Sequence, residues 1–254
     1  IVSDGQAGYS GGGGGSGGSV AINATVMRGS GLVSAEGGAG GFSGGLVAGG
    51  GGSGGRVALH ASSSLDYEGC WSVTGGYRPD TYDLSAEMGA SGSMFFSLNS
   101  FEVRALVFSA QSLCNMSESL VHRTSVGEDV EVLTGVHRES TVLDDSSVLG
   151  LVDLHIVGNV RVLLADAAAS QTVNVSEVVV SPASSGSVTA ALTVGSLTQL
   201  HFPANRFHLT NLDMHIFNTT LVSQTSVSVG DYGNLFLYSS NISEFLKIES
   251  LRFL

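Results

Sequence analysis

The chain has 254 residues, which is long enough to bury a substantial core in one elongated domain. The net charge is −12 with only 10 Lys and Arg residues, so neither nucleic acid nor an anionic membrane surface is an expected partner. Charged residues make up 13%, so the polar surface must consist largely of Ser, Thr, Asn and Gly, which suits sugars or close packing between chains.

A glycine-rich duplicate dominates the beginning of the chain. GGGGSGGSVAI (12–22) and GGGGSGGRVAL (49–59) lie 37 residues apart, since 49 − 12 = 37, and each leads from a glycine tract into alternating apolar residues. A fixed period joined to a strand pattern indicates stacked repeats, in which glycine supplies turns or permits close approach of backbones. The spacing does not continue as an exact sequence period beyond Leu59. Residues 1–64 are predicted to form glycine-rich rungs of a β-solenoid.

The stretch 65–94 is the least repetitive part, and it predicts a loop or excursion from the stack. It contains the single tryptophan, Trp71, for which packing is the expected role and stacking on a sugar the alternative. Cys70 in this stretch and Cys114 beyond it are the two cysteines. They leave two possibilities open, one disulfide or a pair of buried free thiols.

Residues 95–254 contain one predicted strand after another, rich in Val, Thr and Phe and without a sustained helical period. The predicted strands are Phe101 to Phe108, Val130 to Leu133, Val152 to Ile156, Val160 to Leu164, Val173 to Val180, Val188 to Val194, Leu209 to Ile216, Val227 to Val229 and Leu235 to Tyr238.

Several of these strands can be placed in one frame. Leu154, Leu200, Met214 and Leu237 then fall in a single apolar column, the pattern of a right-handed parallel β-helix with an inner wall. Hairpin turns such as Asn-Gly are nearly absent after Gly5, which disfavours the alternative, a β-sandwich. The sequence thus predicts one continuous all-β domain with a glycine-rich first portion.

Five N-glycosylation sequons favour a secretory route and an extracellular or cell-surface location. The sequons begin at Asn23, Asn115, Asn174, Asn218 and Asn241. The chain also opens without an initiator Met or a signal leader, and we expect it to be a fragment of a longer chain.

Two groups of residues could carry chemistry. The shared frame puts His155, His201 and His215 at one outward position, where imidazoles on adjacent rungs could bind a metal, but a solvated polar ladder is the preferred interpretation. Asp144-Asp145 resembles at a loose level the paired carboxylates of β-helix polysaccharide hydrolases. Adjacent strand residues point to opposite faces, so a turn is the better interpretation of this pair.

No nucleophile elbow or phosphate-binding loop is present in a suitable context, and neither a cofactor nor a metal is expected. Two alternatives to a structural role remain open. The first is a carbohydrate-active β-helix enzyme, and the second is a module that binds ice or glycans through a flat Ser/Thr face.

The stretch from Gly14 to Gly41, followed by GGGGSGGRVAL, resembles the glycine-rich repeats of large proteins secreted by protists and algae, including mastigoneme subunits of tubular flagellar hairs. The resemblance implies an extracellular, glycosylated, fibre-forming protein with β-helical segments. We therefore expect a non-catalytic building block of a filament or surface coat, whose partners are copies of itself or other filament subunits, together with N-linked glycans.

Overall fold

The computed structural model describes residues 1–43, 47–77, 88–98 and 103–114, and beyond these the strands from residue 138 onward. The all-β prediction is confirmed for these residues, among which there is no helix. The chain divides into two compact units, Ile1–Thr141 and Val142–Leu254, which are described separately. One strand, β10 (Arg138–Leu143), crosses the boundary between them.

Unit 1 contains long strands, most of them followed by a short one, together with two strands of two residues each. They are β1 (Ser19–Gly29), β2 (Leu32–Ser34), β3 (Phe42–Ser43), β4 (Val47–Ala48), β5 (Arg56–Tyr67), β6 (Cys70–Ser72), β7 (Ser93–Leu98), β8 (Val103–Ser109) and β9 (Leu113–Cys114).

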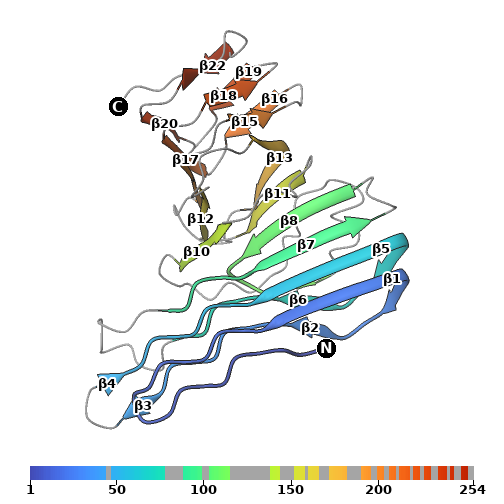
Figure 1. The fold of residues 1–254 in the computed structure, drawn as a ribbon, viewed down its shortest axis with the longest axis vertical. Coiled ribbons are helices and arrows are strands. Elements are labelled where there is room, and N and C mark those ends of the chain that lie inside the picture. Colours follow the sequence, from blue (N-terminus) through green and yellow to red (C-terminus); the bar gives the residue numbers. More distant parts are fainter. Residues whose placement is uncertain are drawn as a thin grey trace. The chain divides into compact units, whose positions relative to one another are not determined.

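Strands β1, β5 and β7 lie side by side and run parallel (Figure 1). Ser19 pairs with Arg56 and Arg56 with Ser93, so the offset of 37 residues occurs twice (56 − 19 = 37 and 93 − 56 = 37). The backbone period therefore continues beyond Leu59, where the glycine-rich sequence repeat stops. What persists there is the spacing of inward apolar residues, which a search for identical glycine strings does not detect.

The direction reverses after the third coil. β8 pairs antiparallel with β7, and β9 pairs antiparallel with β6, whereas β2 and β6 are parallel. Within the predicted excursion 65–94, the described residues include the end of β5, all of β6 and the start of β7. The aromatic and cysteine residues of this stretch differ from the glycine-rich sequence of the earlier coils, so the sequence alone did not indicate that the repeat continues.

The core of unit 1 lies between the long strands and the short ones. Every second residue of β5 is buried except Ser63, which lies at the register shift between β1 and β5, and the neighbours on β1 and β7 occupy the same columns, as in the row Ile22, Leu59 and Phe96. Trp71 on β6 is fully buried and makes edge-to-face ring contacts with Tyr67 and Phe96, at centroid distances of 5.2 and 5.0 Å. Packing, rather than exposed sugar stacking, is therefore the role of Trp71.

Unit 2 contains three sets of parallel strands. Its strands are β11 (Val152–Val157), β12 (Val160–Ala165), β13 (Thr172–Ser181), β14 (Ala190–Gly195), β15 (Gln199–Phe202), β16 (Arg206–Leu209), β17 (Leu212–Phe217), β18 (Thr220–Ser223), β19 (Ser226–Val229), β20 (Asn234–Tyr238), β21 (Asn241–Ile242) and β22 (Lys247–Ser250). The sets follow the orders β11-β13-β15-β18-β21, β12-β14-β17-β20 and β16-β19-β22. Most predicted strands have counterparts here; Val130 to Leu133 lies outside the described residues.

The register of unit 2 corrects the proposed apolar column. Leu154 and Leu200 belong to one set of strands and Met214 and Leu237 to another, and Met214 pairs with Leu235 while Leu237 pairs with Ile216. The predicted inward direction of Leu154 and Met214 is nevertheless observed, since both are buried. A shift of two residues keeps a side chain on the same face, so alternation alone predicts the face but neither the partner nor the sheet.

Candidate functional site

The glycine tracts of unit 1 form a bundle of extended segments. The bundle lies between the long strands and the end of the coils that carries β3 and β4 (Figure 1). Among the described residues, six segments belong to this glycine bundle: 3–9, 12–18, 35–41, 49–55, 73–77 and 89–92. The first, third and fifth make one layer, and the second, fourth and sixth make the other. The long strands β1, β5 and β7 follow directly from the second layer.

Hydrogen bonds between the segments recur at every third residue. Within a layer the segments run parallel, as shown by the bonds that Gly5 N and Gly8 N donate to Glu36 O and Ala39 O, at 2.7 and 2.8 Å. Between layers they run antiparallel; for example, Gly15 N donates to Gln6 O at 2.8 Å. A repeat of three residues with all bonds made to neighbouring segments is that of the polyproline II helix, which forms no internal hydrogen bonds.

Glycine is required in the bundle because the backbones approach too closely for a side chain. A Cβ atom at Gly14 would lie 1.9 Å from Gly38 O, and one at Gly52 would lie 2.0 Å from Gly15 O. At Gly13, by contrast, the nearest atom to an added Cβ is 3.6 Å away, on the outside of the bundle. Only the inward-facing glycines are therefore obligatory, and close approach rather than turn formation explains them.

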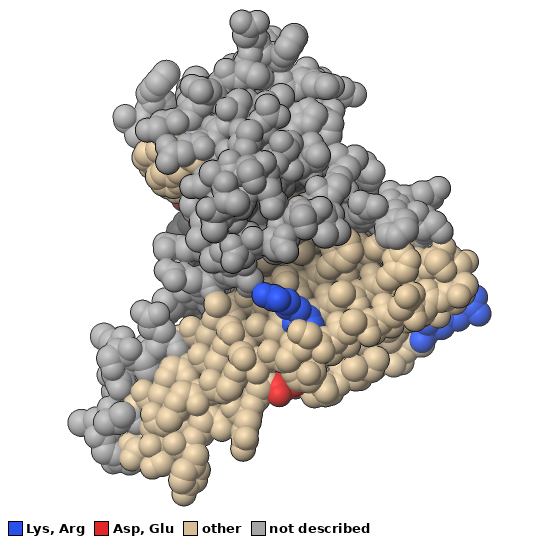
Figure 2. Space-filling view, viewed as in Figure 1, with Lys and Arg blue, Asp and Glu red and all other residues tan. Residues whose placement is uncertain are grey.

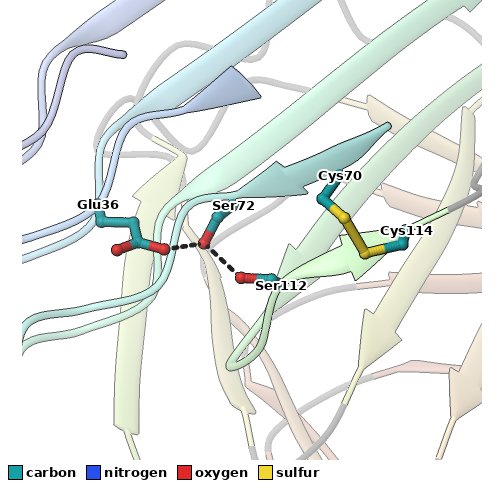
Figure 3. Close-up of a disulfide and its surroundings, with 5 residues drawn as sticks. All are labelled: Glu36, Cys70, Ser72, Ser112 and Cys114. Atoms are coloured by element: carbon teal, nitrogen blue, oxygen red, sulfur yellow. Dashed lines mark hydrogen bonds between the residues drawn. A yellow bond between two sulfur atoms is a disulfide. The ribbon is translucent and has the colours of Figure 1, made fainter. Parts of the chain in front are cut away.

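Carboxylates and serines fasten the junction between the short strands and the glycine bundle. Asp4 Oδ1 accepts hydrogen bonds from Ser34 Oγ and from the backbone N–H of Glu36, the latter at 2.7 Å. In the next coil Ser72 Oγ donates to Glu36 Oε1, and Ser112 Oγ donates to Ser72 Oγ at 3.0 Å (Figure 3). Buried hydroxyls that are satisfied by a carboxylate stabilise a junction.

Cys70 on β6 and Cys114 on β9 form a disulfide with an S–S distance of 2.09 Å (Figure 3). The two residues are directly opposed in the antiparallel pair, and their Cα atoms are 4.0 Å apart. The same turn of chain carries Ser112, so the bridge also holds the hydroxyl that contacts Ser72. Of the two possibilities that the sequence left open, the structure has the bridge.

The structure describes the side chain of one sequon asparagine. Asn23 lies on β1, is exposed to solvent, and pairs in register with His60 of β5. Asn174 is placed in β13 and Asn241 in β21 by their backbones. Asn115 and Asn218 lie outside the described residues.

The histidines do not share one outward position. His155 is on β11 and His201 is on β15, with β13 between these two strands, and His215 is on β17 in a different set. No cluster of metal-ligating side chains occurs among the residues that the structure describes. The shared alignment of the strands is wrong for these histidines for the same reason as for the apolar column. Strands of similar sequence recur on different sides of a coil. Asp144 and Asp145 lie outside the described residues.

His215 takes part in an aromatic column on β17 and β20. Its ring stacks on Phe236 with centroids 4.5 Å apart, and Phe217 stacks on Tyr238 at 4.3 Å. At the start of the same two strands Asn234 Nδ2 donates to Asp213 Oδ1 at 2.7 Å. These are cross-strand pairs of equal register, and they stabilise the parallel pairing.

Sequence reasoning did not predict the polyproline II bundle. Its signal is present in the spacing of glycines by three, as in Gly49, Gly52 and Gly55, which is neither the period of a strand nor that of an α-helix. Each of these three glycines meets a carbonyl of the preceding coil.

No family model, no curated protein and no solved structure matches this chain. Within the described part of the chain, no helix has the length and apolar character needed to cross a membrane.

Proposed function

We propose that this chain is a structural, non-catalytic building block of an extracellular, glycosylated filament or surface coat. The observation that carries the proposal is the glycine bundle, in which backbone hydrogen bonds and close contacts hold the segments together and few functional side chains are displayed. Such an arrangement provides a rigid extended body rather than a reaction site. The disulfide and the exposed sequon at Asn23 support a secreted location.

The fold that we infer for this role is a right-handed parallel β-solenoid, formed by the first three coils of unit 1 and by the strands of unit 2. Parallel pairing of successive coils supports it, with partners 37 residues apart in unit 1 and, in the last coils of unit 2, 21 residues apart, as for Asp213 and Asn234. The handedness follows from the general preference of parallel crossover connections. Coils of this kind can add neighbours along their sides without rearranging, and the resemblance to mastigoneme subunits agrees with such assembly.

The outer face of the glycine bundle is suited to lateral contact. Ser16 and Ser53 are exposed there and occupy equivalent places in successive coils, since 53 − 16 = 37. Small uncharged residues allow two such faces to approach closely, and a glycan on Asn23 would keep part of the side hydrated and limit contact. The proposal therefore predicts association that depends on these small residues.

The test is secretion of the chain from a eukaryotic cell, followed by sedimentation velocity and negative-stain electron microscopy. We expect elongated assemblies, which the double variant Ser16→Lys, Ser53→Lys weakens by charge repulsion. Ser63→Lys, at an exposed position of β5 outside the glycine bundle, is the matched control and should assemble normally. A monomer at every concentration that also cleaves a polysaccharide would overturn the proposal.

Glycosylation is tested separately by mass spectrometry before and after treatment with an N-glycosidase. Removal should lower the mass of the secreted chain, and Asn23→Gln should reduce the difference by one glycan. An unchanged mass after treatment would contradict the glycosylated part of the proposal.

A further inference from the structure

Three aromatic side chains are displayed at the end of the glycine bundle. Tyr9 is 92% exposed, Phe42 is 49% exposed and Tyr77 is 61% exposed. Each lies where a segment of the first layer ends, at 3–9, 35–41 or 73–77. A single exposed ring needs no explanation, but here three rings occur in successive coils of the same layer.

Backbone hydrogen bonds hold these three positions together. Gly8 N donates to Ala39 O at 2.8 Å, and Gly40 N donates to Tyr77 O at 3.0 Å, so the ends of the three segments are joined in a row. Gly41 N donates to Gly12 O at 2.7 Å, which ties the end of the third segment to the turn that follows Tyr9. The rings therefore project from a fixed backbone, so binding would order little besides the side chains.

The turn after Tyr9 is strained. Gly12 N donates to Tyr9 O at 2.9 Å, and the two central residues have positive φ, 48° at Ser10 and 80° at Gly11. Ser10 is the only described residue other than glycine with positive φ. A residue that pays about 1–2 kcal/mol for a left-handed conformation is more often found at functional sites than elsewhere.

Among the residues that the structure describes, those around the three rings carry no charge. The described residues at this end, 7–14, 38–43, 47–52 and 75–77, include no Asp, Glu, Lys or Arg. In the face seen in Figure 2, the described end of the bundle carries neither blue nor red atoms. The chain as a whole has a net charge of −12, which repels polyanions.

We propose that Tyr9, Phe42 and Tyr77, here called the aromatic tip, bind a neutral polysaccharide. The apolar C–H faces of pyranose rings pack against aromatic rings through dispersion and the hydrophobic effect, and the phenol groups can bond to sugar hydroxyls. A row of rings held at successive coils matches a ligand with repeating rings. Acidic polysaccharides are excluded by the negative charge of the chain. This inference goes beyond the proposed building-block role, because it gives the protein a ligand outside its own assembly.

The experiment measures retention of the whole chain on microcrystalline cellulose and on chitin, with soluble polygalacturonate as an anionic probe. The wild-type chain should bind at least one of the neutral polysaccharides and should not bind the anionic one. The triple variant Tyr9→Ala, Phe42→Ala, Tyr77→Ala should lose at least tenfold in affinity. Val26→Ala with Leu32→Ala is the matched control, since both side chains are exposed and apolar but lie on strands β1 and β2.

Folding of each variant is followed by the emission of Trp71, which is buried among Tyr67 and Phe96 and does not belong to the tip. Tyr9→Phe, which keeps the ring, should retain most of the binding. The proposal is overturned if neither neutral polysaccharide is retained, if the triple variant binds as well as the wild type, or if polygalacturonate binds equally. It is also overturned if the triple substitution abolishes only self-association, which would make the tip a contact between copies.

Discussion

The glycine bundle and the strands of unit 1 belong to the same 37-residue coils, yet they pack by opposite rules. In the strands, columns of large side chains fill the space between sheets, and Phe96 and Trp71 are fully buried. In the bundle, contact depends on the absence of side chains, since a Cβ at Gly14 would lie 1.9 Å from a carbonyl oxygen. One coil therefore requires large residues in one half and forbids them in the other.

The largest expected effect on stability concerns the strand core. Phe96→Ala removes a fully buried ring that contacts Trp71, and we expect a loss of about 4 kcal/mol in the free energy of unfolding. Phe95→Ala is the matched control, because this neighbouring ring is half-buried on the other face of β7 and its loss should cost less. Urea unfolding followed by circular dichroism measures both. Equal losses would contradict the assignment of the inward face.

In the bundle, adding a side chain, rather than removing one, is expected to lower the free energy of unfolding. Gly14→Ala adds one methyl group, and we expect it to cost about 3 kcal/mol because backbone atoms of two segments must separate. Gly13→Ala places the same methyl group in the neighbouring position, where the nearest atom is 3.6 Å away, and should change stability by less than about 0.5 kcal/mol. The same urea titration tests the pair. If both variants unfold alike, close approach does not explain the glycines.

The strands were predictable from sequence because alternation reports directly which face is buried. Leu154 and Met214 were expected inside and are inside. Partners were not predictable, since Met214 pairs with Leu235 and not with Leu237, and a shift of two residues leaves the alternation unchanged. The sheet to which a strand belongs depends on the lengths of the connections, which alternation does not encode.

The glycine bundle was not predictable from the same rules. Glycine carries no side chain whose burial could show a period, so tracts such as 49–55 look like flexible linkers or turns. Their order comes from hydrogen bonds to other segments, such as the bond from Gly52 N to Gly38 O at 2.8 Å. The aromatic tip escaped notice for a related reason, because Tyr9 and Tyr77 lie 68 residues apart (77 − 9 = 68) and only the stacked coils bring their backbones into one row.

The disulfide joins the two kinds of packing, because it fixes β9 against β6 where the strand core meets the bundle. Replacing both Cys70 and Cys114 by Ser should cost about 2 kcal/mol, since the bridge closes a loop across a separation of 44 residues. The Trp71 emission should shift to the red at lower urea concentration than in the wild type, because Trp71 pairs with Leu113 beside the bridge. Ser112→Ala, which keeps the bridge and removes only the hydroxyl, should cost less. A double Ser variant as stable as the wild type would show that β9 is held by its other contacts.

The smallest expected effect concerns Tyr67. Its side chain is buried in the strand core, and Tyr67→Phe removes the hydroxyl but keeps the ring. Burial raises the pKa of the Tyr67 phenol above its ordinary value of 10.0, because the charged phenolate is poorly solvated in the core. The unfolded chain then releases this proton at lower pH than the folded chain, so the contribution to stability is complete below about pH 10 and is lost as the pH rises through the folded value. Tyr67→Phe should make unfolding less sensitive to pH above about pH 10. Urea midpoints of the wild type and the variant at a series of alkaline pH values measure the difference. If the Tyr67→Phe slope equals that of the wild type, the folded core does not keep water away from this phenol, and its packing is looser than the burial of Tyr67 indicates.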